Sequence, residues 1–228
     1  MREINRPDGW TIQEILEKET GNRLTRYFYK RKRAPRVQLD SKVAQQLAAY
    51  TLIDKDLRNV IVWLSEIEKL HSREKFKGCH ISQDREIYNI VKSLYVASLT
   101  FYGKCFTSCE GRKLKLEKSL VDTNFLKTHD DVIHMRNNFS AHSGTDSFEE
   151  VKIALVLNPK IKSNMKPEIF RELCQADFKD SDNDDLRFLR LVEHVQVKVA
   201  YKINSLIERI YEKEILPKGK EYWYSRAK

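Results

Sequence analysis

Glycine and proline are scarce in this chain, and their scarcity restricts the folds that are open to it. The 228 residues include only 7 Gly and 5 Pro. An all-β fold needs frequent tight turns, which these two residue types commonly supply. We therefore expect a mainly α fold of long helices, and the chain is long enough for one large domain, or a domain with an appended arm, that buries its own core.

Apolar side chains recur every three or four positions in several segments, as the buried face of a helix requires. Helices are predicted over residues 41–71, 83–103 and 122–143, and in a long segment that follows residues 177–185 and ends near Glu214. Asp40 or Ser41 can cap the first of them. In the last helix a heptad spacing, which either packs internally or pairs with another subunit, joins Val192, Gln196, Val199, Ile203, Leu206 and Ile210.

Other patterns set the expected domain layout. Val151, Ile153 and Leu155 alternate with other residues before Asn158-Pro159, which predicts a strand in a small hairpin over about 148–166. The expected layout is a basic and aromatic N-terminal arm with a short helix (1–39), a helical domain (40–216) and a C-terminal tail (217–228).

The charge of the chain favours a polyanionic partner. The formal net charge is +9 and the isoelectric point is about 9.3. Phosphates neutralised by Lys and Arg release condensed counterions, so RNA is the expected partner. In residues 23–36, seven of fourteen residues are Arg or Lys, with aromatic residues at 27–29 available to stack on bases. The predicted RNA-binding residues are Arg31, Lys32, Arg33, Arg36, Arg112, Lys113 and Lys115. The alternative is a merely solvated arm, or one that docks an acidic partner.

Two further features bear on location. No apolar run approaches the roughly 20 residues that a membrane-spanning helix needs, and the first residues contain no apolar signal segment. The four cysteines fit reduced thiols better than a disulfide framework. A cytoplasmic protein that is neither secreted nor embedded in a membrane is the expectation.

An arginine falls on the apolar face of the third predicted helix. At about 100° per residue, the stripe formed by Phe125, His129 and Val132 also contains Arg136 and Phe139. A guanidinium keeps its charge when buried, so its burial requires an anion or a function. The alternative is a structural ion pair with a neighbouring carboxylate.

A histidine follows six positions later, near the end of the same helix. His142 is displaced from Arg136 by a net angle of about 120° on an ideal helix, so the two do not share a face. Either the last turn loosens, or two copies of the helix combine their side chains across a dimer axis. The alternative for the histidine alone is a favourable interaction with the helix dipole.

The segment MRNNFSAHSG (135–144) resembles the signature of the HEPN superfamily, an Arg and a His separated by four to six residues on a helix. Five residues intervene here. The resemblance covers about residues 40–215 and implies a HEPN-like bundle of four to five helices, here with the hairpin inserted after the motif helix. It also implies a metal-independent endoribonuclease without a cofactor, in a toxin–antitoxin, phage-defence or RNA-processing setting, with an active site between the protomers of a homodimer.

The resemblance also implies roles for individual residues. His142 would act as general base or acid in the attack of a ribose 2′-hydroxyl on the adjacent phosphate, which leaves a 2′,3′-cyclic phosphate end. Arg136 would bind the scissile phosphate. Asn137 matches the polar position after the Arg and would orient the pair, and His129 on the same stripe would support them.

Two other functions compete with the nuclease. The first is a di-iron helical bundle, because Glu68-x-x-His71 and Asp131-x-x-His134 pair a carboxylate with an imidazole at helical spacing. The second is a helical protein that recognises RNA, or a protein partner such as an antitoxin, without turnover. The sequence does not separate this binding protein from the nuclease.

Overall fold

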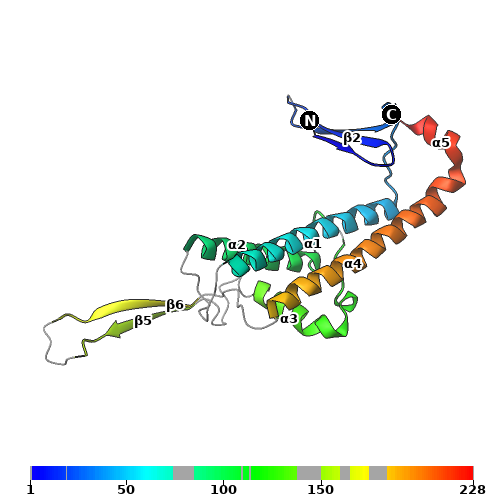
Figure 1. Ribbon diagram of the computed structural model, residues 1–228. Coiled ribbons are helices and arrows are strands. Elements are labelled where there is room, and N and C mark those ends of the chain that lie inside the picture. The colour runs from blue at the N-terminus through cyan, green and yellow to red at the C-terminus, as the bar shows by residue number, and fades with distance from the viewer. Residues whose placement is uncertain are drawn as a thin grey trace. The chain divides into compact units, whose positions relative to one another are not determined.

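The chain consists of two compact units. The computed structural model describes residues 2–18, 20–73, 85–108, 110–112, 114–137, 150–159, 165–174 and 184–227. One unit comprises Met1–Gln45 together with Ser205–Lys228, and the other comprises Gln46–Asn204. Each unit is described by itself below, and Figure 1 labels the main elements of both.

Helices dominate the second unit. The long elements are α1 (Lys42–Arg73), α2 (Arg85–Cys105), α3 (Leu126–Met135) and α4 (Asp184–Ile210), and the short turns η1 (Lys118–Leu120) and η2 (Thr123–Phe125) precede α3. Ser41 caps α1, because its Oγ accepts a hydrogen bond from the Ala44 N–H at 3.1 Å. Among the described residues, no helix combines the length and apolar character needed to cross a membrane.

The predicted apolar periodicity forms the core of this unit. Fully buried side chains come from each long helix, including Ile53, Leu57 and Val60 of α1, Leu99 and Tyr102 of α2, Val132 of α3, and Leu191, Val192 and Val195 of α4. Trp63 of α1 packs edge-on against Phe101 of α2 with ring centroids 5.0 Å apart. Gln196 of α4 donates a hydrogen bond to Asp54 of α1 at 2.8 Å. Figure 1 shows α1, α2 and α4 lying along one another, as these contacts require.

The apolar heptad residues of α4 pack against other parts of the same chain. Val192 and Val199 belong to the core of the helical unit, and Leu206 and Ile210 are buried as well. Since these side chains are covered by the chain itself, the heptad is not a free surface for a second subunit. Of the two interpretations left open by the sequence, internal packing is the one observed.

The N-terminal residues form a β-sheet, which corrects the expected fold class. Four antiparallel strands pair in the order β1-β2-β3-β4, with bounds β1 (Arg2–Asn5), β2 (Trp10–Leu16), β3 (Arg23–Tyr29) and β4 (Lys32–Ala34). The expected arm with a short helix is therefore wrong, and the protein is a mixed α/β chain and not a mainly α, HEPN-like bundle. Among the described residues, helices supply most of the core that surrounds α3, and Leu116 and Val121 from the segment before α3 complete it.

The sheet forms despite the small number of glycines because its three turns need only two of them. Gly9 has a φ of +88° and Gly21 a φ of +70°, so each provides the left-handed backbone that a tight turn requires. The third turn uses no glycine: Lys30 and Arg31 adopt φ values of +46° and +66°. A low glycine count therefore did not exclude a local meander of strands.

The remaining elements are a hairpin and a C-terminal helix. β5 (Glu150–Val156) pairs with β6 (Glu168–Cys174), so the hairpin is confirmed but continues beyond the expected end at 166. The predicted tail is helical: a π-helical turn (Tyr211–Ile215) and a 3-10 turn (Leu216–Lys218) lead into α5 (Gly219–Arg226).

A buried carboxylate joins α1, α2 and the segment that follows them. Asp56 is 1% exposed, and its Oδ2 lies 3.0 Å from Lys104 Nζ and 3.5 Å from Arg112 Nη1. Arg112 is itself buried and also donates to the carbonyl oxygens of Leu114 and Lys104. This network holds Arg112 and Leu114 against the end of α2, because neither buried charge can be left without the other.

We predict that Asp56→Ala destabilises the helical unit strongly. The substitution leaves the Arg112 guanidinium buried without its carboxylate, which costs roughly 3–5 kcal/mol of unfolding free energy. Urea unfolding followed by circular dichroism measures the change. The matched control is Asp130→Ala, which removes an exposed ion pair with Lys118 and should cost less than about 1 kcal/mol. Equal effects of the two substitutions would contradict the role of Asp56.

Candidate functional site

Arg136 directly follows α3 and is fixed against α2. His129 and Val132 bury one side of α3, as the helical wheel predicted, and this orientation turns Arg136 toward Gly103. A Cβ atom at Gly103 would lie 3.0 Å from Arg136 Cγ and 3.1 Å from Cδ. A side chain at position 103 would therefore force the half-buried arginine stem to shift by a few tenths of an ångström.

The Arg136 guanidinium is held by an amide. Its Nη1 donates a hydrogen bond to Asn137 Oδ1 at 2.9 Å. Within the part of the chain that the structure describes, no Asp or Glu forms an ion pair with Arg136. The structural ion pair considered from the sequence thus has no partner among those residues. An arginine whose stem is packed and whose charge is matched by no described carboxylate is suited to bind an external anion.

The backbone changes geometry at the same point. α3 ends at Met135, and residues 136–137 continue in π-helical geometry. The wider turn interrupts the regular 100° step per residue on which the predicted separation of Arg136 and His142 depended. This change agrees with a loosened last turn, one of the two routes proposed for bringing them together. His142 itself lies outside the described residues.

His129 belongs to the core and does not contact an open site. The side chain is 4% exposed, and its Nδ1 shares a hydrogen bond of 2.8 Å with the Tyr102 hydroxyl. The ring also packs against Phe106, with centroids 4.6 Å apart. Burial lowers the pKa of His129 below its usual value, so the ring is neutral at physiological pH. The support that His129 gives to Arg136 is therefore the placement of α3 on α2.

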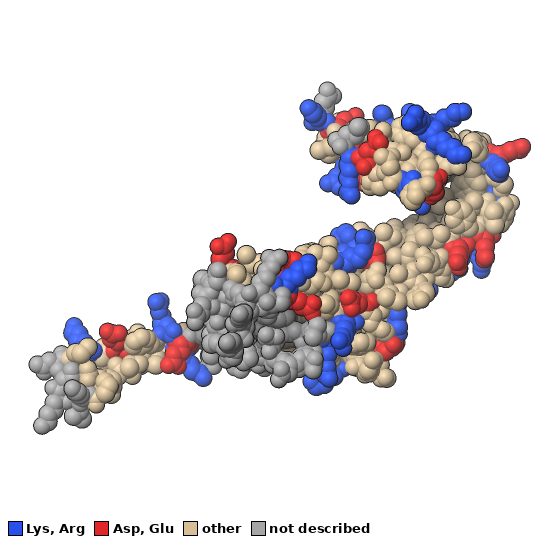
Figure 2. Space-filling model, in the orientation of Figure 1, with Lys and Arg blue, Asp and Glu red and all other residues tan. Residues whose placement is uncertain are grey.

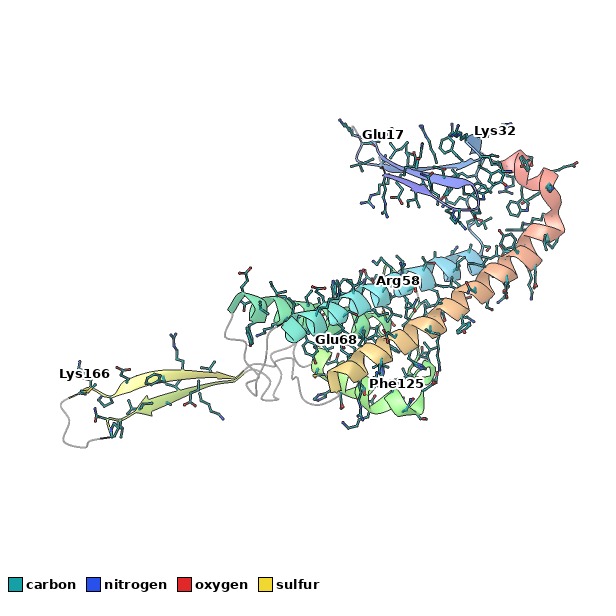
Figure 3. All side chains as sticks on the ribbon, viewed as in Figure 1. Glu17, Lys32, Arg58, Glu68, Phe125 and Lys166 are labelled. Carbon is teal, nitrogen blue, oxygen red and sulfur yellow. The ribbon has the colours of Figure 1, made fainter. Side chains whose placement is uncertain are left out.

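Four of the predicted RNA-binding residues come from the edge of the N-terminal sheet. Arg31 lies in the β3–β4 turn, Lys32 and Arg33 are in β4, and Arg36 follows it. All four are exposed. Figure 3 labels Lys32 on this sheet, and Figure 2 shows Lys and Arg side chains projecting from the visible surface of the sheet.

The second predicted group of basic residues does not form a free surface. Arg112 is buried with Asp56 and is removed from the expected RNA contact. Lys115 is exposed but lies 3.7 Å from a Glu117 carboxylate oxygen, and Lys118 pairs with Asp130 at 2.6 Å. Lys113 lies outside the described residues. The tertiary fold brings Asp56 of α1 to Arg112 and Asp130 of α3 to Lys118, whereas the carboxylate near Lys115 comes from the same connection.

The structure also reveals residues that the sequence argument missed. Trp10 pairs with Tyr29 across β2 and β3, and the exposed Arg23 and Arg26 belong to β3. A signal for them was present, since Asp8-Gly9 and Gly21-Asn22 are typical hairpin turn pairs and flank a segment of alternating residues.

The β3–β4 turn carries backbone strain. Lys30 and Arg31 are the two central residues of a tight turn and both have positive φ, the pattern of a type I′ turn that favours Asn and Gly. Sparsely populated backbone of this kind costs of order 1–3 kcal/mol per residue. Two cations therefore occupy positions at which Asn or Gly is more stable.

The di-iron alternative receives no support from the described residues. In those parts of the chain, no three His, Cys, Asp or Glu side chains lie close enough together to hold a metal ion. Asp131, one of the ligands considered, pairs instead with Lys127 at 3.1 Å. Both Asp131 and His134 are exposed on α3 and do not face the interior of the helices.

Comparisons of the chain with protein-family models, with curated proteins and with solved structures found no match.

We predict that His129 makes the stability of the helical unit depend on pH. Because its folded pKa is lowered, its contribution is complete above the unfolded value of about 6.5 and is lost as the pH falls through and below that value. In the unfolded chain, but not in the folded one, His129 then binds a proton. Urea midpoints at pH 7.5 and pH 5 measure the loss, which should be smaller in His129→Gln.

The exposed His134 of the same helix provides the matched control for this measurement. His134→Gln should keep the pH dependence of the unmodified chain, since this side chain is not in the core. A His129→Gln variant that lost as much stability on acidification as the unmodified chain would contradict the prediction.

Proposed function

We propose that this protein binds RNA and cleaves it without a metal ion, with Arg136 and His142 as the catalytic pair. The observation that carries the proposal is the state of Arg136: its stem is packed on Gly103, its guanidinium is held by Asn137, and no described carboxylate neutralises it. The resemblance of residues 135–144 to the HEPN signature supports the same assignment.

The chemistry uses groups of the chain and of RNA alone. The ribose 2′-oxygen attacks the adjacent phosphorus, its proton passes to a base, and the 5′-oxygen of the next nucleotide leaves with a proton from an acid. An imidazole can perform either transfer near neutral pH, which is the role of His142. The fork of donors on Arg136 binds the non-bridging phosphate oxygens and offsets the charge that grows on them.

A shared site in a homodimer remains part of the proposal. Two copies of the segment after α3 would combine their Arg136 and His142 side chains, in a surface distinct from the internal heptad of α4. Sedimentation at micromolar concentration tests this point, and a monomeric mass in an active preparation would contradict the shared site.

A second function, RNA binding without turnover, is favoured by the N-terminal sheet. Its exposed basic residues at the β3–β4 edge do not depend on the catalytic pair. The two functions are separated by whether RNA is cleaved.

We predict that Arg136→Ala and His142→Ala each abolish cleavage. Loss of a transition-state donor lowers the rate roughly 100- to 1,000-fold, and loss of the general acid or base roughly 100- to 10,000-fold. The assay incubates labelled RNA with each purified variant in chelator and identifies the ends as 2′,3′-cyclic phosphates. His134→Gln on α3 is the matched control and should retain activity. Cleavage that survives both substitutions, or that requires added magnesium, would overturn the nuclease.

We also predict that Gly103→Ala lowers the cleavage rate. The new Cβ would lie 3.0–3.1 Å from Cγ and Cδ of Arg136, so the stem, and the guanidinium that it carries, has to shift by a few tenths of an ångström. A displacement of about 1 Å can cost 100-fold in rate, which is the upper limit expected here. Single-turnover cleavage measures the change, with Gly111→Ala as control because a Cβ at Gly111 meets no atom within 4 Å. An unchanged rate in Gly103→Ala would show that the packing of Arg136 on α2 has no role in catalysis.

A further inference from the structure

The N-terminal sheet has two faces of different composition. Residues that pair directly across antiparallel strands place their side chains on the same face. Trp10 pairs with Tyr29, Ile12 with Tyr27, and Tyr29 with Lys32. One face therefore presents three aromatic rings and a lysine, whereas Phe28 lies on the other face.

The aromatic face is partly exposed: Tyr29 is exposed, whereas Trp10 and Tyr27 are half-buried. None of the residues described in β1–β4 is fully buried. Tyr29 is 42% exposed, and its ring lies 5.1 Å from that of Trp10 at an interplanar angle of 47°. Tyr27 lies two residues before Tyr29 on β3, so the rings follow one another along the strand. A row of rings on a partly exposed sheet face is the arrangement on which unpaired bases stack.

The charge around these rings is positive. Residues 1–36 contain ten Lys and Arg against five Asp and Glu. Two of the carboxylates are already paired within the sheet unit, Glu14 with Arg2 and Asp8 with Arg6. No ion pair to a described carboxylate involves the basic side chains of β3, its turn and β4, which are Arg23, Arg26, Lys30, Arg31, Lys32 and Arg33. By the strand register, Arg26 and Arg33 lie with Phe28 on the opposite face, and Lys32 lies on the face of the rings.

Aromatic rings and basic side chains lie together at one end of the sheet. The Lys30 N–H donates to the Gly9 carbonyl at 3.0 Å, so the β1–β2 turn and the β3–β4 turn lie together. Trp10 and Tyr29 are the strand residues at this end. Lys30 Nζ lies over the Tyr29 ring, 5.4 Å from its centroid. The strained turn thus holds two cations beside these rings.

We infer that this end of the sheet is a binding site for single-stranded RNA. Unpaired bases stack on Trp10, Tyr29 and Tyr27, and the phosphates are bound by Lys30, Arg31 and Lys32. A duplex is excluded from this mode because its bases are already stacked on one another. As a statement about the substrate of the nuclease, single-stranded RNA, this inference rests on the proposed function. Binding of RNA at the site does not itself require Arg136 or His142.

Stacking is tested by fluorescence anisotropy with a labelled 12-nucleotide RNA of mixed sequence. Every protein in the assay carries His142→Ala, so that the RNA is not consumed. Trp10→Ala and Tyr29→Ala should each weaken binding roughly five- to 100-fold, the range observed for loss of a stacking ring. Phe28→Ala on the opposite face is the matched control and should change the affinity less than twofold.

The turn provides a second variant that separates binding from folding. Lys30→Asn combined with Arg31→Gly installs the residues that a type I′ turn favours, so the melting temperature should rise or stay unchanged. The same variant should weaken RNA binding and reduce the slope of log K against log salt by about 0.7 for each lost phosphate contact. Unchanged affinity and slope in this variant would overturn the inference.

Three further results test whether this end of the sheet binds single-stranded RNA: the preference for single strands over duplexes, the oligomeric state, and the cleavage of RNA. Tighter binding of single-stranded than of duplex RNA supports the inference, and equal or tighter binding of the duplex overturns it. A concentration-dependent dimer that Trp10→Ala disrupts, in a protein that binds no RNA, would also overturn the inference. The aromatic face would then be covered by a second copy of the chain. RNA binding without cleavage by the unmodified chain leaves this inference intact and refutes the nuclease, whereas cleavage unaffected by Trp10→Ala and Tyr29→Ala refutes only this inference.

Discussion

The attachment of α3 to α2 is the constraint on which the position of Arg136 depends. The hydrogen bond between His129 and Tyr102 closes a buried aromatic cluster, and Val132 completes the apolar stripe beside it. With that face of α3 fixed, the arginine one turn later has to cross α2, where Gly103 leaves room for its stem. The buried histidine thus has a structural role, and it fixes the position of the arginine that we propose as the phosphate-binding group.

The basic residues of this chain have two distinct environments. In the helical unit, two of the cations outside the Arg136 region are matched by carboxylates: Arg112 with Asp56 in the interior, and Lys118 with Asp130 at the surface. In the sheet, the cations of the β3–β4 edge form no ion pair with a described carboxylate. A net positive charge therefore does not by itself locate a phosphate-binding surface, because the fold neutralises one basic cluster and leaves another free to act.

The sequence predicted the helices well and the N-terminal strands poorly, for a physical reason that particular residues illustrate. The 3.6-residue periodicity of Ile53, Leu57 and Val60 is repeated over many turns, so the buried face of α1 was evident. The sheet is made of short strands with both faces partly exposed, and its apolar alternation is weak. Its third turn was hidden altogether, since Lys30 and Arg31 are not residues that favour positive φ.

The sequence by itself determined the helical periodicity, the positive charge, and the presence of an arginine on the apolar stripe of the third helix. Only the tertiary structure decided that Arg112 is an internal counter-ion, that His129 is a core residue, and that Trp10 and Tyr29 stand side by side. Periodicity is a local property, because it is set by residues that are close together in the sequence. Each of these outcomes depends instead on which group from a distant segment contacts the side chain. The packing of the whole fold decides which groups come into contact, and therefore which charges are neutralised and which rings touch.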